Sequence, residues 1–439
     1  MFRCLTIVAI TAFTAAAAMA DDSHRPWPNP IPAPPGLEAA PGPWSDPEDL
    51  TLWPNRTSRA NSDPWIAENH DRIRQMRPRV LLVNFSNEHS RELLEGLAGR
   101  IVAALAEASR YHGYANREAP VFLQYEVFQF VDLRDDDRQT GDSRQMPIKD
   151  PRRRRGFNMQ YRDYFSDSFA RHFGVRDPRQ SGRFLRLDEL LDGGYVHEVW
   201  FFVSGTESVP HSGAYEVVEE KPRYDAQFRK VGNEFVQAGN GGDDDQPWTG
   251  RSVRIGCINA SRGVGCFLES LSHGMEGNCT SGAIPYFTQY FRDYGGYNLK
   301  EKFKLPFDTF YDLEYVPEPL KYLDEKTLVL RHRGQEYRVE NYIPTAGNAH
   351  IPPNGRGHYD LGNEHGVLST IEDWRIGSDG GKDRVKPFTN ATFRGYHDLA
   401  PDCMGAWLVY WRQNMPGLDN RQKDDAGGPM KNWWPFLFY

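Results

Sequence analysis

The residues best suited to chemistry lie on one predicted helix, near the middle of the chain. Glu269, His273 and Glu276 occupy positions i, i+4 and i+7, and at about 100° per residue they fall within a sector of about 60°. A histidine and two carboxylates that point the same way could hold a metal ion or act as acid and base. The pattern makes Glu269 and Glu276 candidate catalytic residues, and His273 and Glu276 candidate metal ligands.

An ordinary solvated helix face is the main alternative for this polar stripe. The apolar residues of the same segment gather on nearly the opposite side: Val264, Phe267, Leu268, Leu271 and Met275. Four glycines between positions 263 and 277 argue against a solvated face, because glycine weakens an exposed helix but allows another segment to approach closely. The motif itself is short, and the H-E-x-x-H pattern of zinc peptidases is absent.

A second polar segment lies downstream, at Asn348-Ala-His-Ile-Pro-Pro-Asn and Gly357-His-Tyr-Asp. The two prolines fix the backbone and would present His350 and Asn354 rigidly. We expect His350 to bind substrate or a metal ion, Asn354 to contact substrate, and Asp360 to be a third candidate catalytic carboxylate beside His358. A structural turn with satisfied polar groups is the alternative.

Tryptophans and one arginine complete the candidate substrate contacts. Trp374 follows Glu372-Asp373, and Trp433 stands in Lys431-Asn-Trp-Trp near the end of the chain. Paired tryptophans on a loop can stack on sugar rings, but they can equally fill the core, which we favour for the pair. Arg262 precedes the helix stripe and is the remaining candidate. Glu198, on a predicted buried strand, must be either paired or functional.

These residues need a scaffold, and the pattern over 77–300 predicts an α/β core. Short apolar runs rich in β-branched and aromatic residues predict strands over 79–85, 121–133, 196–203 and 252–258. Helical patterns alternate with them over 90–108, 161–173, 187–191, 264–275 and 286–294. Such alternation predicts a mainly parallel sheet with flanking helices.

After residue 300 the alternation of strand and helix patterns ends. A hairpin is predicted over 327–332 and 336–339, around Arg333-Gly334. The rest of 301–439 is punctuated by glycine and proline, with scattered tryptophan. We therefore expect a loop-rich, partly β C-terminal portion packed on the core.

The N-terminal residues 1–20 have the pattern of a secretory signal peptide. Arg3 precedes an alanine-rich apolar run that ends in Ala18-Met-Ala20; a short membrane anchor is the alternative. Residues 25–47 hold nine prolines, so 21–76 are read as a proline-rich lead-in. The sequence thus predicts a secreted or periplasmic protein with no transmembrane segment in the mature chain.

Export would permit disulfides among the four later cysteines, Cys257, Cys266, Cys279 and Cys403, in any of three pairings. A zinc site of three cysteines and a histidine is a weaker alternative, because no C-x-x-C spacing is present. The net charge of −8 over 439 residues argues against a nucleic-acid partner. Neither a G-x-S-x-G elbow, a P-loop, nor a G-x-G-x-x-G after a strand occurs.

In combination, these motifs resemble a family of secreted bacterial and fungal proteins of obscure function. The matching segments are Glu198-Val-Trp200, Arg262 to Glu276, His350 to Asn354, Tyr359-Asp360, Asp373-Trp374 and Asn432-Trp-Trp434. Two positions depart from the family pattern, His197 before the strand acid and Cys266 where a glutamate is expected. The resemblance implies that the motifs form one site, but it names no reaction.

Three functions are compatible with these observations. The first is a secreted hydrolase that acts on a polysaccharide or glycoconjugate by carboxylate acid/base catalysis. The second is a metal-dependent hydrolase in which a divalent ion is held by His273, Glu276 and His350, with Glu269 or Asp360 activating water. The third is a non-catalytic glycan-binding or envelope protein. The sequence names no cofactor, and a glycan or another extracellular substrate is the expected partner.

Overall fold

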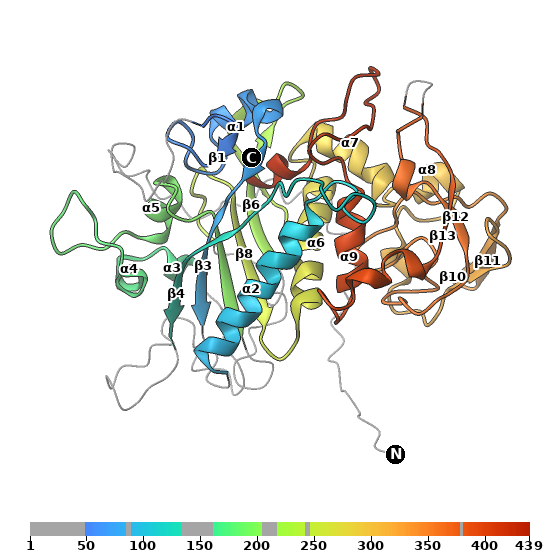
Figure 1. The fold of residues 1–439 in the computed structure, drawn as a ribbon, viewed down its shortest axis with the longest axis horizontal. Coiled ribbons are helices and arrows are strands. Elements are labelled where there is room, and N and C mark those ends of the chain that lie inside the picture. Colours follow the sequence, from blue (N-terminus) through green and yellow to red (C-terminus); the bar gives the residue numbers. More distant parts are fainter. Residues whose placement is uncertain (1–48, 85–88, 134–160, 204–216, 242–245, 378–380) are drawn as a thin grey trace, which may run out of the picture.

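A six-stranded sheet forms the centre of the molecule (Figure 1). The computed structural model describes residues 49–84, 89–133, 161–203, 217–241, 246–377 and 381–439. The strands are β3 (Arg79–Asn84), β4 (Glu126–Asp132), β5 (Glu198–Val203), β6 (Val217–Tyr224), β7 (Lys230–Gln237) and β8 (Val253–Asn259). In the order β4-β3-β5-β8-β6-β7, the first four are parallel, and β6 and β7 are antiparallel at one edge. The fold is therefore mixed α/β with a mostly parallel central sheet, as the alternation of elements predicts.

Helices cover both faces of this sheet. On one face α2 (Arg91–Ala108) and α6 (Val264–Ser281) lie against the strands, and α7 (Pro285–Tyr294) and α9 (Gly405–Gln413) pack on these helices. The other face packs against α3 (Tyr161–Tyr164), α4 (Asp167–Phe173) and α5 (Leu187–Asp192). Because successive strand residues point to opposite faces, Leu82 and Trp200 join the first layer, and Leu81 and Val199 join the second. In Figure 1 the sheet lies between α3–α5 on the left and α2, α6 and α9 on the right.

The folded unit begins earlier than the sequence predicts. Residues 49–76 were expected to belong to the proline-rich lead-in, but β1 (Leu52–Trp53) pairs in parallel with β2 (Gln75–Met76), and α1 (Pro64–Glu68) lies between them. Trp53, Ile66 and Met76 are buried in the main core. The predicted boundary near residue 77 was too late, because the nine prolines that define the lead-in end at residue 47. The signal peptide and the proline-rich run itself lie outside the described residues.

The C-terminal portion is partly β, and it packs against α6 and α7. It contains the short helix α8 (Leu299–Phe303), the sheet of β9 (Leu320–Tyr322), β10 (Leu328–His332) and β11 (Gln335–Val339), and the pair β12 (Val367–Ser369) and β13 (Lys386–Phe388). The predicted hairpin is present as β10 and β11. Arg333 and Gly334 between these strands both have positive φ angles, 50° and 81°, as a tight hairpin turn requires.

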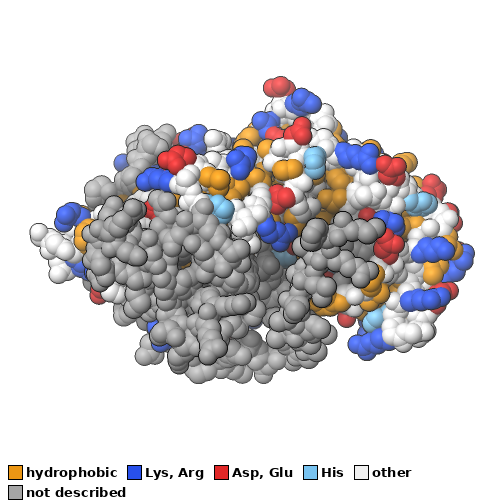
Figure 2. All heavy atoms as spheres, turned by 90° about the horizontal axis from the view of Figure 1, so that it is seen from below, with side chains coloured by type: hydrophobic (Ala, Val, Ile, Leu, Met, Phe, Trp, Pro, Cys, Tyr) orange, Lys and Arg blue, Asp and Glu red, His pale blue; other side chains and the backbone are white. Residues whose placement is uncertain are grey.

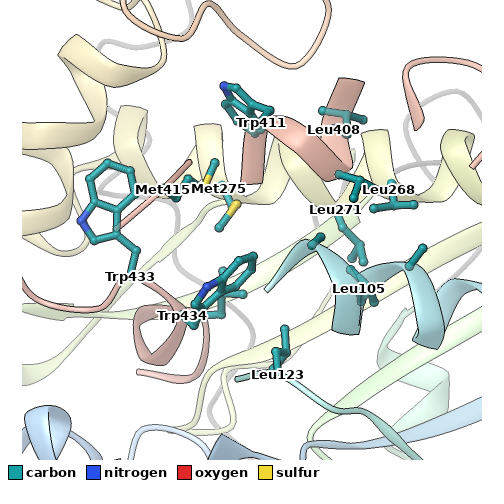
Figure 3. Close-up of a cluster of buried hydrophobic side chains, with 14 of the residues drawn as sticks. Leu105, Leu123, Leu268, Leu271, Met275, Leu408, Trp411, Met415, Trp433 and Trp434 are labelled. Carbon is teal, nitrogen blue, oxygen red and sulfur yellow. The ribbon is translucent and has the colours of Figure 1, made fainter. Parts of the chain in front are cut away.

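The tryptophans of this portion belong to the core. Figure 3 shows Trp433 and Trp434 beside Met275 of α6 and Met415, which follows α9. Trp374 and Trp433 are both 0% exposed. Neither can stack on a ligand, so the substrate-binding role expected for these two residues is wrong, and the core alternative holds.

The described surface carries mixed charge. On the face that Figure 2 shows, Lys and Arg side chains alternate with Asp and Glu over the described part. That part of the face therefore has no continuous basic patch of the kind that nucleic-acid binding uses. Within the described ranges, none of the helices is long and apolar enough to cross a membrane.

Candidate functional site

The polar stripe of α6 is buried, so it is not a solvated helix face. Glu269, His273 and Glu276 are 8%, 9% and 4% exposed. Figure 3 shows the apolar side of α6, where Leu268 and Leu271 pack against residues of α2 and α9. The stripe faces the C-terminal portion instead, where His350 and Tyr311 lie against it.

The start of α6 is held by a carboxylate from far along the chain. Asp402 accepts hydrogen bonds from the backbone N–H groups of Gly263, Gly265 and Cys266, at 2.8–3.0 Å. A negative charge at a helix N-terminus is stabilising, because the free N–H groups point at it. Gly265 is required here, since a Cβ at this position would lie 1.9 Å from the carbonyl oxygen of Asp402. The contact fixes the helix against the segment that carries Cys403.

The loop that carries His350 is equally constrained. Asn348 Oδ1 accepts from the backbone N–H groups of His350 and Ile351. The N–H of Ala349 donates to Glu276 Oε1 at 3.0 Å. Trp407 of α9 donates its indole N–H to the carbonyl of Asn348. These bonds fix the backbone on both sides of His350 and aim its imidazole at α6.

Three ligand-type atoms meet where this loop covers α6. His273 Nε2 lies 3.0 Å from His350 Nε2, which lies 2.8 Å from Glu269 Oε1. The third distance, from His273 Nε2 to Glu269 Oε1, is 3.8 Å. In a tetrahedral zinc site with bonds near 2.0 Å, ligand atoms lie about 3.3 Å apart. The three observed distances bracket that value.

The hydrogen bonds on the far side of each imidazole fix its tautomer. His273 Nδ1 lies 2.7 Å from Glu276 Oε2, and an ionised carboxylate can only accept, so Nδ1 carries the proton. His358 Nε2 donates to the carbonyl of Phe310, which leaves its Nδ1 to accept from His350 Nδ1 at 3.0 Å. Burial lowers the pKa of His358 to about 4, so this ring is neutral at pH 7. Neighbours therefore hold the Nδ1 protons of His273 and His350, so a cation that replaced the Nε2 protons shared with Glu269 would meet the Nε2 lone pairs of both rings.

The two glutamates of α6 are held ionised. Burial opposes ionisation, but hydrogen bonds from His273 and His350 outweigh it and hold the pKa of Glu269 well below its usual value. Burial also opposes the charge of Glu276, whose pKa is nevertheless lowered by His273 and the Ala349 N–H. A negative oxygen and two imidazole Nε2 atoms thus converge, which is the donor set of many zinc sites.

Tyr359 and Cys403 both contact the carboxylate of Glu269. The Tyr359 hydroxyl donates to Glu269 Oε1 at 2.8 Å and lies 3.0 Å from His350 Nε2. The Cys403 thiol donates to Glu269 Oε2 and lies 3.3 Å from Arg262 Nη2. Both residues have left-handed backbones, with φ of 63° and 48°. Such strain in bulky residues clusters at functional sites.

A surface cleft of about 380 Å³ opens beside this group. Its lining includes Glu314, Arg356, His358, Tyr359 and Asp360. Tyr359 therefore lies between the cleft and the ligand atoms, with 48% of its surface exposed. Glu314 is 3.7 Å from His350 Nδ1, and the atoms of Glu314, His350 and His358 form a second group close enough to hold an ion.

Several predicted site residues take other roles. Both oxygens of Glu276 are occupied, by His273, the Ala349 N–H and the Tyr311 hydroxyl, so it supports a ligand rather than facing a substrate. Asp360 lines the cleft, but its carboxylate is bound by Arg356 at 2.8 Å. Asn354 is 1% exposed and binds backbone carbonyls, which is the structural alternative named for it.

The cysteines also differ from expectation. No disulfide joins Cys257, Cys266, Cys279 and Cys403. Neither of the two groups of described residues that could hold a metal ion contains a cysteine. The sequence had no signal for Tyr311, Glu314 or Asp402, because each comes from a loop or short turn whose contact with α6 depends on the tertiary fold.

Comparisons with protein-family models, with curated proteins and with solved structures found no match for this chain. The resemblance described from the sequence motifs therefore stays a prediction, and the site is interpreted from its geometry alone.

Proposed function

We propose that this protein is a metal-dependent hydrolase whose divalent ion is held by Glu269, His273 and His350. The observation that carries the proposal is the convergence of two imidazole Nε2 atoms and one carboxylate oxygen within 4.8 Å of one another. A cation between them would neutralise the carboxylate and take up both lone pairs. Two histidines and a glutamate are the ligands of several zinc peptidases.

The neighbours of the three ligands support this assignment. Glu276 holds the Nδ1 proton of His273, and His358 accepts the Nδ1 proton of His350. Metal-ligating histidines nearly always donate their other ring N–H in this way, which fixes the ring and makes it a better ligand. Glu276 is therefore proposed to support His273 from outside the coordination sphere, in place of the ligand role inferred from the sequence.

The same contacts weigh against carboxylate acid/base catalysis on a glycan. That mechanism needs two carboxyl groups that reach the sugar. Glu276 has protein donors on both of its oxygens, and Asp360 is bound by Arg356. A bound ion supplies the missing chemistry, because it polarises an acyl oxygen and lowers the pKa of bound water. We therefore propose an ester or amide as the bond that is hydrolysed, outside the cytoplasm as the signal-like N-terminus indicates.

Hydrolysis by the full chain tests this proposal. The protein is stripped with a chelator, reloaded with zinc, and assayed on an activated aryl ester and on an unstructured protein. We expect activity that follows zinc, and a loss of about a thousandfold or more in His350→Ala. His365→Ala is the matched control, because this histidine is exposed and outside the group.

Activity that survives chelation, or that His350→Ala leaves unchanged, would contradict the metal-dependent hydrolase. A protein that binds its ion but hydrolyses neither substrate would favour the non-catalytic binding protein. Iron in place of zinc in the purified protein would also contradict hydrolysis, because two histidines and a carboxylate with open positions serve iron oxygenases as well.

A further inference from the structure

Tyr359 separates the ligand atoms from the surface cleft. Its hydroxyl lies 2.8 Å from Glu269 Oε1 and 3.0 Å from His350 Nε2. Its ring is tilted over the His350 ring with centroids 4.4 Å apart. The other side of the residue lines the cleft together with Glu314 and His358. Tyr359 therefore lines the cleft and contacts two of the three ligand atoms.

The hydroxyl oxygen of Tyr359 lies about as close to two of the ligand atoms as the ligand atoms lie to one another. A phenol has one proton, and here Glu269 Oε1 accepts it. The oxygen therefore turns a lone pair toward His350 Nε2, the atom through which His350 would bind the ion. Its distances of 2.8 Å and 3.0 Å to two of the ligand atoms match those among the ligand atoms themselves. An ion surrounded by the three ligands would have this oxygen beside it.

The backbone of Tyr359 brings the hydroxyl to this position. Its φ of 63° is left-handed, which is costly for a large side chain. The N–H of Tyr359 donates to the carbonyl of His350 at 3.0 Å, which folds the chain back on the ligand that the ring covers. A conformation that costs free energy and aims one side chain at a site points to a role for that side chain.

We propose that the Tyr359 hydroxyl oxygen is the fourth ligand of the ion in the resting protein, and that a substrate oxygen entering from the cleft displaces it. The proposal rests on the metal site of the proposed function. When the metal–oxygen bond forms, the phenol proton passes to solvent. When substrate takes the position, that bond breaks and the phenolate regains a proton from solvent. The half-exposed ring can turn into the cleft to make room.

Copper(II) is the probe for this arrangement, because a phenolate bound to copper(II) absorbs visible light by charge transfer. The full chain is loaded with copper(II) and its visible spectrum recorded. We expect a charge-transfer band in the wild type and its loss in Tyr359→Phe. Tyr337→Phe is the matched control, because this tyrosine lies on β11 and packs against the hydrophobic cluster of the β9–β11 sheet, so it should keep the band.

Displacement is tested on the unmodified chain. Acetohydroxamate, a small chelating probe, is added to the copper-loaded wild type, and the band should bleach while copper stays bound. This measurement does not depend on the folding of any variant. A wild type that binds copper without the band, a Tyr359→Phe protein that keeps it, or a band that acetohydroxamate leaves in place overturns the role of Tyr359 but leaves the metal site standing. Copper binding that His273→Ala does not weaken overturns both proposals.

Discussion

Glu276 illustrates how much the role of a residue depends on its contacts. It shares a helix face with Glu269, and from the sequence both are candidate catalytic residues but only Glu276 is a candidate metal ligand. In the structure Glu269 points an oxygen at His350 Nε2, whereas Glu276 accepts the Nδ1 proton of His273. The first oxygen can bind an ion, and the second acts through the histidine. The role of each glutamate depends on which nitrogen of His273 it lies near: Glu269 lies near Nε2, and Glu276 lies near Nδ1.

We expect Glu276→Gln to weaken zinc binding by about 10-fold to 100-fold, because groups that support a ligating histidine contribute on that scale. The amide fills the same volume but loses the charge that orders the His273 tautomer. Isothermal titration with zinc measures the effect, and melting curves confirm that the variant is folded. Glu340→Gln, on an exposed residue paired with Arg338, is the control. Equal affinities in the two variants would mean that Glu276 is not coupled to the ion.

At the scale of elements, the site depends on how closely α6 packs against its neighbours. A Cβ at Gly277 would lie 1.3 Å from the carbonyl oxygen of Ala238, the residue after β7. α6 therefore fits under this segment only because position 277 is glycine. The glycines that argue against a solvated helix in the sequence do mark close approaches of other segments.

Gly277→Ala should destabilise the protein by at least about 2 kcal/mol, since the added methyl group overlaps backbone that cannot move aside. The same substitution at Gly99 of α2 should stabilise it by about 1 kcal/mol, because nothing lies within 4 Å of its Cβ position and alanine favours the helix. Urea unfolding of both variants gives the two values. A Gly277→Ala protein as stable as the wild type would refute the close packing of α6.

A buried group of charges joins the sheet to the C-terminal segment. Arg254 of β8 bridges Glu198 of β5 and Glu219 of β6, at 2.6 Å and 3.1 Å. Lys221 of β6 lies 3.5 Å from Glu219 and donates to the carbonyls of Phe436, Leu437 and Tyr439. Glu198 is thus paired, as one of its two sequence-based alternatives requires.

Burial lowers the pKa of Lys221 to about 8, which gives the stability a measurable pH dependence. Between pH 8 and the ordinary lysine value near 10.5, the unfolded chain binds more protons than the folded one, so this group makes stability rise with pH. The slope of the unfolding free energy against pH from this one group is at most about 1.4 kcal/mol per pH unit. Lys221→Met should be less stable, and its unfolding free energy from pH 8 to 10 should lack this slope. Identical slopes in both proteins would exclude a buried charged lysine.

The whole molecule brings its site together from distant parts of the chain. α6 supplies two of the three proposed ligands from the α/β core, and the C-terminal portion supplies His350, Tyr359, Tyr311 and the Asp402 contact. The aromatic residues at the end of the chain pack under α6 and α9 (Figure 3). The two portions share one hydrophobic core, so the site forms only when both are folded.

Local patterns in the sequence predict the local elements well. β3, α2 and the β10–β11 hairpin lie where apolar period and turn chemistry predict them, because each is determined by adjacent residues. β6 was missed, because its Glu-Glu-Lys-Pro run resembles a solvated loop although those residues are buried. α9 was missed because it is buried on every side and has no polar face to give a helical period.

For the site, the sequence could identify the α6 stripe and the His350 loop, but it could not assign roles within them. Which glutamate faces the Nε2 of His350 and whether Trp433 is exposed both depend on contacts between residues tens to hundreds of positions apart. Spacing along one helix cannot contain that information.

The central claim is that Glu269, His273 and His350 hold one divalent ion, and zinc stoichiometry tests it most directly. The purified full chain is freed of metal, equilibrated with zinc, and its metal content measured beside His273→Ala, His350→Ala and the His365→Ala control. The account predicts one tightly bound zinc per chain in the wild type and the control, and its loss in the other two variants. A wild type that retains no zinc, or a His273→Ala and a His350→Ala protein that each retain one, would contradict it.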